Sequence, residues 1–462
     1  GFLNVFCFFN YKKSICFWNR IADILKPRFF STSCKNADNK NPNIRSNLYS
    51  SLFQTVGNNI RIYGSAFSKN CDSRIHMFDL ACRTNDIVQA FRLNDKANQK
   101  STHICIDAIR NPYEAMFFQD RYAAFYLMSI NTSEPERLRR LSSMSKPEID
   151  CLDNVEYASD YKGLDSFTKQ DIASCIQLSD IHLDNPKCET EANNNPELTK
   201  QIVRYVCLMM HPGLVTPTAV ERCMQVAHNA RLNSGCLSRQ VGAVITDKDY
   251  SIKAIGWNDV ASGQIPCNLR DVRALCQYHD RSSHSRFELE DENFQEFITN
   301  KYKGINYSKL KGRLYPYCFS EVYNQEKSEQ LNEKPAYPDG SRIRYVKNQV
   351  YTRSLHAEEN AFLQITKYGG EGIQGGNLFV TASPCELCSK KSYQLGIKHI
   401  YYIDPYPGIA KEHILDFSRD PELNPELHIF TGAIGRAYIQ LYIQKIPYKD
   451  ELASLLDDTA PR

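Results

Sequence analysis

Two short motifs constrain the fold of this chain more than any other feature, because they must meet in space. Residues 356–358 read His-Ala-Glu, and residues 384–388 read Pro-Cys-Glu-Leu-Cys. Zn²⁺ prefers thiolate and imidazole ligands in a tetrahedron, and a catalytic site keeps one position for water. Cys385 and Cys388 at a helix start can reach one ion, and a helix N-terminus also favours thiolate. With His356 as the third ligand, the sequence predicts a catalytic zinc site built from two helix starts.

Glu358 is the predicted catalytic residue beside this ion. It lies at the same helix opening as His356, so its carboxylate can face a water without binding the metal. Zinc lowers the pKa of such a water towards about 7. Glu358 would then take the proton and deliver it to a ring nitrogen and to leaving ammonia. The pattern H-x-E…P-C-x-x-C is the signature of zinc deaminases.

Two other interpretations of these motifs fit less well. A closed structural zinc site needs a fourth protein ligand, and none is evident at the expected spacing. A redox Cys-x-x-Cys pair does not require a His-x-Glu motif upstream. We therefore prefer the catalytic interpretation.

Composition sets outer limits on the protein. A chain of 462 residues is long enough for two domains. The net charge of +3 is too small to indicate a broad basic surface for binding nucleic acid. Of the 17 cysteines, some stand singly in apolar runs, as in Val206-Cys207-Leu208 and Ile104-Cys105-Ile106, which is typical of buried thiols in a reducing cytoplasm. The apolar run at residues 1–9 is too short to span a membrane. Because the chain begins with Gly1 rather than Met, we expect that an upstream piece is missing.

Hydrophobic patterning predicts an α/β protein with two domains. The first domain, residues 1–190, contains a βαβ unit, with strands at 103–107 and 122–130 around a helix that opens near Pro112. A polar, Asn-rich linker follows at residues 187–198. The second domain, residues 200–462, has predicted strands at 240–246, 251–257, 377–382 and 398–403, helices from about 355 and 384, and a long insertion at about 261–348.

The second domain resembles the deoxycytidylate deaminase family of the zinc-dependent cytidine deaminase superfamily. The resemblance spans about residues 215–405, and four stretches carry it: residues 236–245, 256–259, 355–361 and 383–388. It implies a cytidine-deaminase-like α/β/α sandwich. It also implies hydrolytic deamination of a deoxycytidine nucleotide, with water attacking carbon 4 of cytosine.

The same resemblance assigns substrate-binding residues. Asn258 would hydrogen-bond the sugar or base, and Thr381 and Ser383 would line the base pocket. Ser238 and Arg239 would lie near the phosphate, for which a guanidinium is suited by its paired donors. Asn258 could instead be a turn residue, and Ser238 and Arg239 could belong to a solvated loop.

The whole chain resembles the bacterial anti-phage dCTP/dCMP deaminases, which fuse a P-loop-kinase-like domain to the deaminase. Residues 106–114, 348–355, 403–408 and 430–438 carry this likeness. The family implies depletion of dCTP during infection, control by a regulatory nucleotide and, in some members, inhibition by a small RNA. Deaminases of this type usually assemble, so we expect a homo-oligomer.

The first domain departs from that family in one respect. No G-x-x-x-x-G-K-[ST] loop occurs in the chain, so kinase activity is not assigned. Asp107 and Arg110, which follow the strand at 103–107, are candidates for touching a regulatory nucleotide, and a structural salt bridge is an equal alternative.

The insertion raises two further hypotheses. Five residues there could build a second, structural zinc site, although their spacing matches no standard motif; they are Cys267, Cys276, His279, His284 and Cys318. Six aromatic residues could stack single-stranded nucleic acid, although core packing or subunit contact is favoured; they are Tyr302, Tyr307, Tyr315, Tyr317, Phe319 and Tyr323.

The sequence thus predicts a zinc-dependent deaminase of a free deoxycytidine nucleotide, either dCTP or dCMP. The rival enzyme is a nucleic-acid-editing cytidine or adenosine deaminase, which shares the zinc motif. A third candidate is a non-catalytic nucleotide sensor. Glu358 argues against the sensor, since binding alone would not need it.

Overall fold

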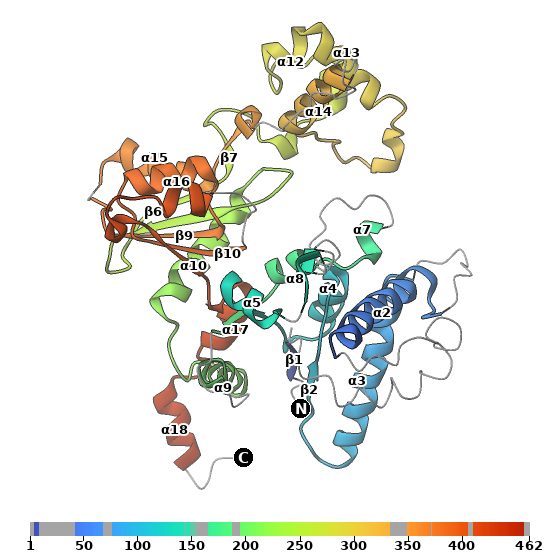
Figure 1. Ribbon diagram of the computed structural model, residues 1–462, viewed down its shortest axis with the longest axis vertical. Coiled ribbons are helices and arrows are strands. Elements are labelled where there is room, and N and C mark those ends of the chain that lie inside the picture. The colour runs from blue at the N-terminus through green and yellow to red at the C-terminus, as the bar shows by residue number, and fades with distance from the viewer. Residues whose placement is uncertain are drawn as a thin grey trace. The chain divides into compact units, whose positions relative to one another are not determined.

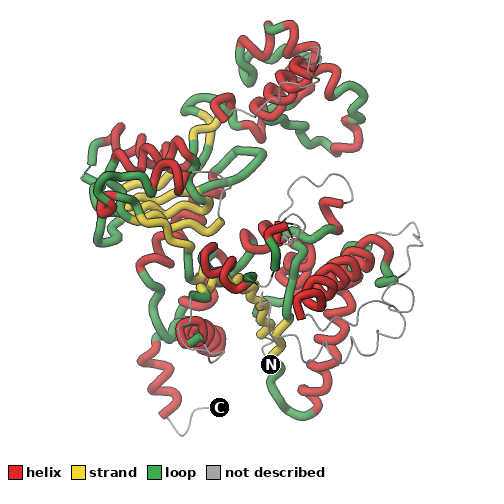
Figure 2. Tube along the Cα trace, in the orientation of Figure 1, coloured by secondary structure: helices red, strands yellow, loops and turns green. Residues whose placement is uncertain are grey.

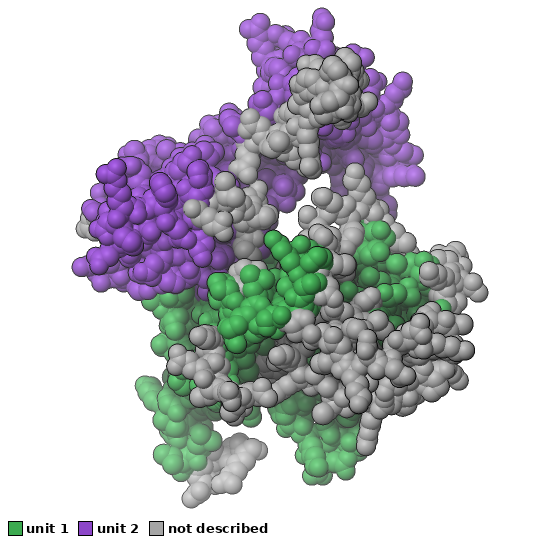
Figure 3. Space-filling model, in the orientation of Figure 1, with its two compact units in different colours: residues 1–221, 431–462 green, residues 222–430 purple. Residues whose placement is uncertain are grey.

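A computed structural model describes most of the chain. The described residues are 4–8, 42–67, 76–142, 144–147, 149–150, 153, 165–186, 195–332, 349–370, 372–404 and 410–456. Most of the predicted linker, residue 348 of the predicted lead-in to the zinc motif, and residues 405–408 of the predicted turn lie outside them. The chain forms two compact units, residues 1–221 with 431–462, and residues 222–430 (Figure 3).

The first unit contains a β-sheet and several helices (Figures 1 and 2). The strand order of the sheet is β12-β4-β3-β1-β2, in which β1 to β4 are parallel and β12 is antiparallel. Its strands are β1 (Asn4–Phe8), β2 (His103–Ile106), β3 (Phe125–Asn131), β4 (Ile181–Asp184) and β12 (Gly432–Ala433). Its helices are α2 (Pro42–Tyr63), α3 (Asp79–Ala97), α4 (Pro112–Arg121), α5 (Glu134–Arg140), α7 (Asp165–Thr168), α8 (Ile172–Gln177), α9 (Pro196–Met210), α17 (Gly435–Tyr442) and α18 (Tyr448–Leu456).

The predicted βαβ unit is present in this unit. Helix α4 begins at Pro112, where a proline costs no hydrogen bond, and Asn111 caps it by accepting from the backbone N–H of Tyr113 at 2.9 Å. The following strand begins at Phe125 rather than at Tyr122, because Tyr122 ends the helix. The unit is therefore mixed α/β, and its likeness to a P-loop kinase stays a prediction.

The boundary between the units differs from the predicted one, because residues 431–462 return to the first unit. Glu221 is buried and accepts hydrogen bonds from Tyr205 (2.8 Å), Tyr442 (2.6 Å) and the backbone N–H of Ala433 (3.0 Å). It also completes a capping box with Thr218, whose backbone N–H donates to it at 2.8 Å. This carboxylate joins α9, the start of α10 (Ala219–Ala230), β12 and α17. The predicted second domain, residues 200–462, did not include a return of the chain to the first unit.

The second unit contains a five-stranded sheet with the order β11-β10-β9-β5-β6. Its strands are β5 (Gly242–Thr246), β6 (Ile252–Trp257), β9 (Asn377–Ala382), β10 (His399–Asp404) and β11 (Glu426–Ile429), and β7 (Asp259–Val260) pairs with β8 (Ser354–Leu355). Its helices are α10 (Ala219–Ala230, which starts in the first unit), α11 (Val272–Cys276), α12 (Arg286–Glu290), α13 (Glu292–Lys301), α14 (Phe319–Asn332), α15 (Ala357–Tyr368) and α16 (Glu386–Gln394). Short 3₁₀ turns occupy Arg231–Asn233, Cys267–Leu269, Tyr307–Leu310, Gln349–Tyr351 and Pro421–Leu423, and a π turn occupies Lys411–Leu415.

The predicted strands and helices of this sheet are confirmed, with ends shifted by one or two residues. Strands β9, β10 and β11 run parallel, whereas β5 is antiparallel to both β9 and β6. Helices α15 and α16 cover one face, and α10 lies on the other (Figure 1). On the α15 face, Ala243 and Ile245 pack with Ala361 and Phe362 in a buried cluster. These layers place the starts of α15 and α16 on the same side of the sheet.

The insertion forms a hydrophobic core of its own from α11, α13 and α14. Arg270 and Glu288 form a fully buried ion pair there, and the hydroxyl of Tyr317 donates to Glu288 at 2.5 Å. Tyr317 is buried, and Phe319 and Tyr323 pack against the same cluster. This packing favours the core interpretation of the aromatic residues over a nucleic-acid stacking surface. Within the described ranges, no helix has the length and apolar character needed to cross a membrane.

Candidate metal centre

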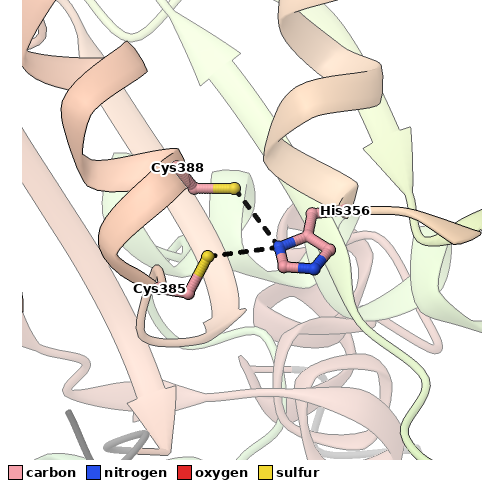
Figure 4. Close-up of side chains that lie close together, drawn as sticks. All are labelled: His356, Cys385 and Cys388. Carbon is pink, nitrogen blue, oxygen red and sulfur yellow. Dashed lines mark hydrogen bonds between the residues drawn. The ribbon is translucent and has the colours of Figure 1, made fainter. Parts of the chain in front are cut away.

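The two zinc motifs meet at adjoining helix starts. His356 immediately precedes α15, and Cys385 immediately precedes α16. The Nδ1 atom of His356 lies 3.3 Å from Sγ of Cys385 and 3.4 Å from Sγ of Cys388 (Figure 4). Tetrahedral zinc with ordinary Zn–N and Zn–S bonds holds its nitrogen and sulfur ligands about 3.5 Å apart. The three side chains therefore fit this ion in both chemistry and spacing.

Close packing of α15 on the sheet sets the position of His356. A Cβ atom on Gly256 of β6 would lie 2.2 Å from the carbonyl oxygen of Ala357 and 2.6 Å from the backbone nitrogen of Ala361. The side chain of Asn360 donates to the carbonyl of Trp257 at 2.7 Å. The first turn of α15 is thus held against β6 at Gly256 and at Trp257.

The carboxyl of Glu358 is buried beside the three ligands. Its exposed fraction is 4%, and burial raises its pKa to about 7. Hydrogen bonds from Cys388 and then from His356 lower the pKa of the Cys385 thiol to about 4, so this group is a thiolate at neutral pH. A carboxyl that titrates near neutrality can both accept and return a proton.

Asn258 lies at the edge of the sheet near these motifs, where its amide binds backbone. Its Oδ1 accepts from the N–H of Val241 at 2.7 Å, and its Nδ2 donates to the carbonyl of Arg239 at 2.7 Å. The side chain is 8% exposed. These contacts are those of a residue that holds the 239–241 segment, and its predicted contact with substrate stays a prediction.

The other predicted substrate residues lie around the carboxyl ends of β9 and β10. Thr381 accepts from the N–H of Gly242 at 3.2 Å, and the N–H of Ser383 donates to the carbonyl of Asp404 at 2.9 Å. Arg239 forms an ion pair with Asp404, and Ser238 is exposed. In parallel sheets, ligands bind next to the carboxyl ends of the strands. Sequence patterning missed Asp404, although its position at the end of a predicted strand was a usable signal.

The remaining predicted site residues, which are those of the first unit and of the insertion, are not part of the cluster formed by His356, Cys385 and Cys388. In the first unit, Asp107 is exposed and Arg110 half-buried after β2, and their regulatory role stays a prediction. The five Cys and His residues of the insertion do not converge, because among the described residues only two groups of three or more metal-binding side chains come together. One group is His356, Cys385 and Cys388. The other is His399, Glu426 and His428, which the sequence did not indicate.

Comparison with known families agrees with this geometry. Residues 320–404 match the family model described as the cytidine and deoxycytidylate deaminase zinc-binding region. The matches support that deaminase family. Zinc is the cofactor of this region.

Individual relatives each cover less than half of the chain. The deoxycytidylate deaminase of Enterobacteria phage T4 is 28% identical over 183 residues, which are 40% of this chain and 76% of the phage protein. The deoxycytidylate deaminase of Enterobacteria phage T2 is 27% identical over 210 residues, 44% of this chain and 93% of that protein. A solved dCMP deaminase of the cyanophage S-TIM5, in complex with dCMP and dUMP, is 23% identical, with a TM-score of 0.23, over 47% of this chain and 99% of that one.

Proposed function

We propose that this protein is a zinc-dependent deaminase that hydrolyses a free deoxycytidine nucleotide, dCTP or dCMP, to the deoxyuridine nucleotide and ammonia. The observation that carries the proposal is the convergence of His356, Cys385 and Cys388 beside the buried carboxyl of Glu358. A structural zinc site would have no use for such a carboxyl. The names of the T4 and T2 relatives, both deoxycytidylate deaminases, support the choice of nucleotide.

The residues of the site have separate tasks in this reaction. His356, Cys385 and Cys388 hold the zinc, which when bound lowers the pKa of a water towards about 7. Glu358 takes a proton from the water that attacks carbon 4 of cytosine and passes it to ring nitrogen 3. Glu358 then takes the second proton from the new hydroxyl on carbon 4 and passes it to the amino group, which leaves as ammonia. One water is consumed and the ring keeps its new oxygen, so the atoms balance.

The substrate is held, in this proposal, at the carboxyl ends of β9 and β10. Thr381 and Ser383 line the base pocket, and Ser238 and Arg239 face the phosphate. Asp404 pairs with Arg239 and so holds its guanidinium over this edge of the sheet. A phosphate that approaches must compete with this carboxylate for the guanidinium of Arg239.

The first unit regulates the deaminase in this proposal. Its four parallel strands are compatible with a kinase-like domain, and Asp107 and Arg110 follow β2, where such sheets bind ligands. A bound nucleotide or a small RNA would act through this unit, and the enzyme would deplete dCTP in anti-phage defence as a homo-oligomer. These finer points rest on the resemblance to the anti-phage deaminases.

A substrate panel tests the proposal against its rivals. The full chain, loaded with zinc, is incubated with dCTP, dCMP, CTP and a cytosine-containing oligonucleotide, and ammonia and the uracil product are measured. We expect conversion of dCTP or dCMP only. Conversion of the oligonucleotide alone would establish an editing enzyme, and tight binding without conversion would establish a sensor. A Cys385→Ser variant without zinc is the matched control for contaminating deaminases.

A further inference from the structure

Three metal-binding side chains converge on the sheet of the second unit, away from the zinc motifs. His399 lies on β10, and Glu426 and His428 lie on the neighbouring edge strand β11. In the parallel register, His399 pairs with Glu426, and His428 comes two residues later. Residues two apart on a strand share a face, so all three side chains project from the same side. Ile400 and Leu427, which alternate with them, face the core under α15.

The distances among their ligand atoms are those of a metal site. Nδ1 of His399 lies 3.1 Å from Nε2 of His428. Oε2 of Glu426 lies 3.5 Å from the first of these nitrogens and 3.6 Å from the second. Nitrogen and oxygen ligands of a tetrahedral zinc ion stand about 3.3 to 3.4 Å apart. The three ligand atoms therefore lie close enough together to bind a single ion.

Neighbouring side chains contact these three residues and fix their orientation, as residues around the ligands of a metal site commonly do. The ring of Tyr401 stacks on His428, with centroids 4.8 Å apart and planes 23° from parallel. Lys398 approaches the other carboxylate oxygen of Glu426, Oε1, at 3.7 Å, which leaves Oε2 for the two imidazoles. Lys398 is itself fixed by donating to the carbonyl of Glu422 at 2.7 Å.

We propose that His399, Glu426 and His428 form a second metal site that binds a divalent first-row transition ion such as Zn²⁺. Two imidazoles and one carboxylate suit zinc, cobalt or nickel, whereas Mg²⁺ and Ca²⁺ prefer sites made of oxygen alone. The side chains are 34%, 53% and 35% exposed, in that order, so an ion and a completing water can reach them. Among the described strands, β11 is at the edge of the sheet and pairs only with β10. An ion bound by both strands would therefore stabilise this edge.

Metal stoichiometry of the full chain tests this proposal independently of any deaminase activity. The protein is stripped with a chelator, dialysed against micromolar free zinc, and analysed by plasma mass spectrometry. We expect two zinc ions per chain in the wild type, and one in His428→Ala, in which the Cys385/Cys388 site remains filled and reports correct folding. A Cys385→Ser, Cys388→Ser double variant should keep one ion. The control His413→Ala, at an exposed histidine outside the cluster, should keep two.

A second measurement covers the case in which His428→Ala fails to fold. Glu426→Gln keeps the size of the side chain and should weaken the second site while leaving the first filled. Cobalt replacement separates the sites by absorption, since sulfur-to-cobalt charge transfer belongs only to the cysteine site. One ion per chain in the wild type would overturn the proposal. So would a second ion that survives both His428→Ala and Glu426→Gln, or one that is lost in Cys267→Ser and therefore lies in the insertion.

Discussion

Gly256 on β6 lies against Ala357 so closely that a Cβ atom at the glycine would sit 2.2 Å from the carbonyl oxygen of Ala357. Ala357 stands between His356 and Glu358, so this contact sets the depth at which the proposed zinc ligand and the proposed catalytic carboxyl lie. Any side chain at residue 256 must push the first turn of α15 away from the sheet. The geometry of the metal centre thus depends on a glycine that binds neither metal nor substrate.

Gly256→Ala should therefore impair zinc binding and activity together. Overpacking of this kind costs about 1–3 kcal/mol, and His356 would move relative to Cys385 and Cys388. Zinc retention during dialysis against a weak chelator and the rate of deamination should both fall. Gly372→Ala is the matched control, because nothing lies within 4 Å of a Cβ atom there. Full zinc retention in Gly256→Ala would show that α15 is not fixed by this contact.

Glu358→Gln should keep zinc and lose activity. The amide preserves the size of the side chain but cannot carry the proton, and general acid–base groups contribute roughly 10²- to 10⁴-fold to rate. The measurement is the turnover number at saturating nucleotide, together with zinc content. Glu359→Gln is the control, since this half-exposed neighbour forms an ion pair with Lys391 instead. Turnover within tenfold of wild type in Glu358→Gln would remove Glu358 from the mechanism.

Asn258→Ala should destabilise the protein more than it weakens substrate binding. It would leave the N–H of Val241 and the carbonyl of Arg239 without the partners they have at 2.7 Å. Unsatisfied buried groups cost about 1–3 kcal/mol each. Urea denaturation should show the loss, with exposed Asn300→Ala as the control. If stability is unchanged and KM alone rises, Asn258 is a substrate residue, as the family resemblance implies.

His182 should make the first unit less stable in mild acid. It is fully buried on β4, Ser129 bonds its Nδ1 at 2.8 Å, and burial lowers its pKa from 6.5 to about 4. Between these values the unfolded chain binds the proton and the folded chain does not, so stability is full above pH 6.5 and falls as the pH drops towards 4. The contribution lost by pH 5 is about 2 kcal/mol.

Urea unfolding at pH 7.5 and pH 5 measures this loss. In His182→Asn, the difference between the two pH values should shrink by about 2 kcal/mol, because the titrating group is gone. An unchanged difference would assign the acid sensitivity to other groups.

The sequence by itself determined the chemistry of the centre and the elements that carry it. His356, Glu358, Cys385 and Cys388 were identified because metal ligands and a proton-transfer group have few substitutes, so their types and local spacing are informative. Strands β5, β6, β9 and β10 could be predicted because an apolar run bounded by turn residues is a local signal. Sequence patterning also placed the start of α4 near Pro112, since a helix start depends on residues close together in the chain.

Tertiary structure decided what depends on residues far apart in the chain. The return of residues 431–462 to the first unit depends on the burial of Glu221 with Tyr205 and Tyr442, and no local pattern contains that contact. The contacts of the Asn258 amide with Val241 and Arg239 join residues 17 and 19 positions apart, so only the structure shows them. The cluster of His399, Glu426 and His428 exists only because two parallel strands pair in one register, and register is a property of the sheet rather than of either strand.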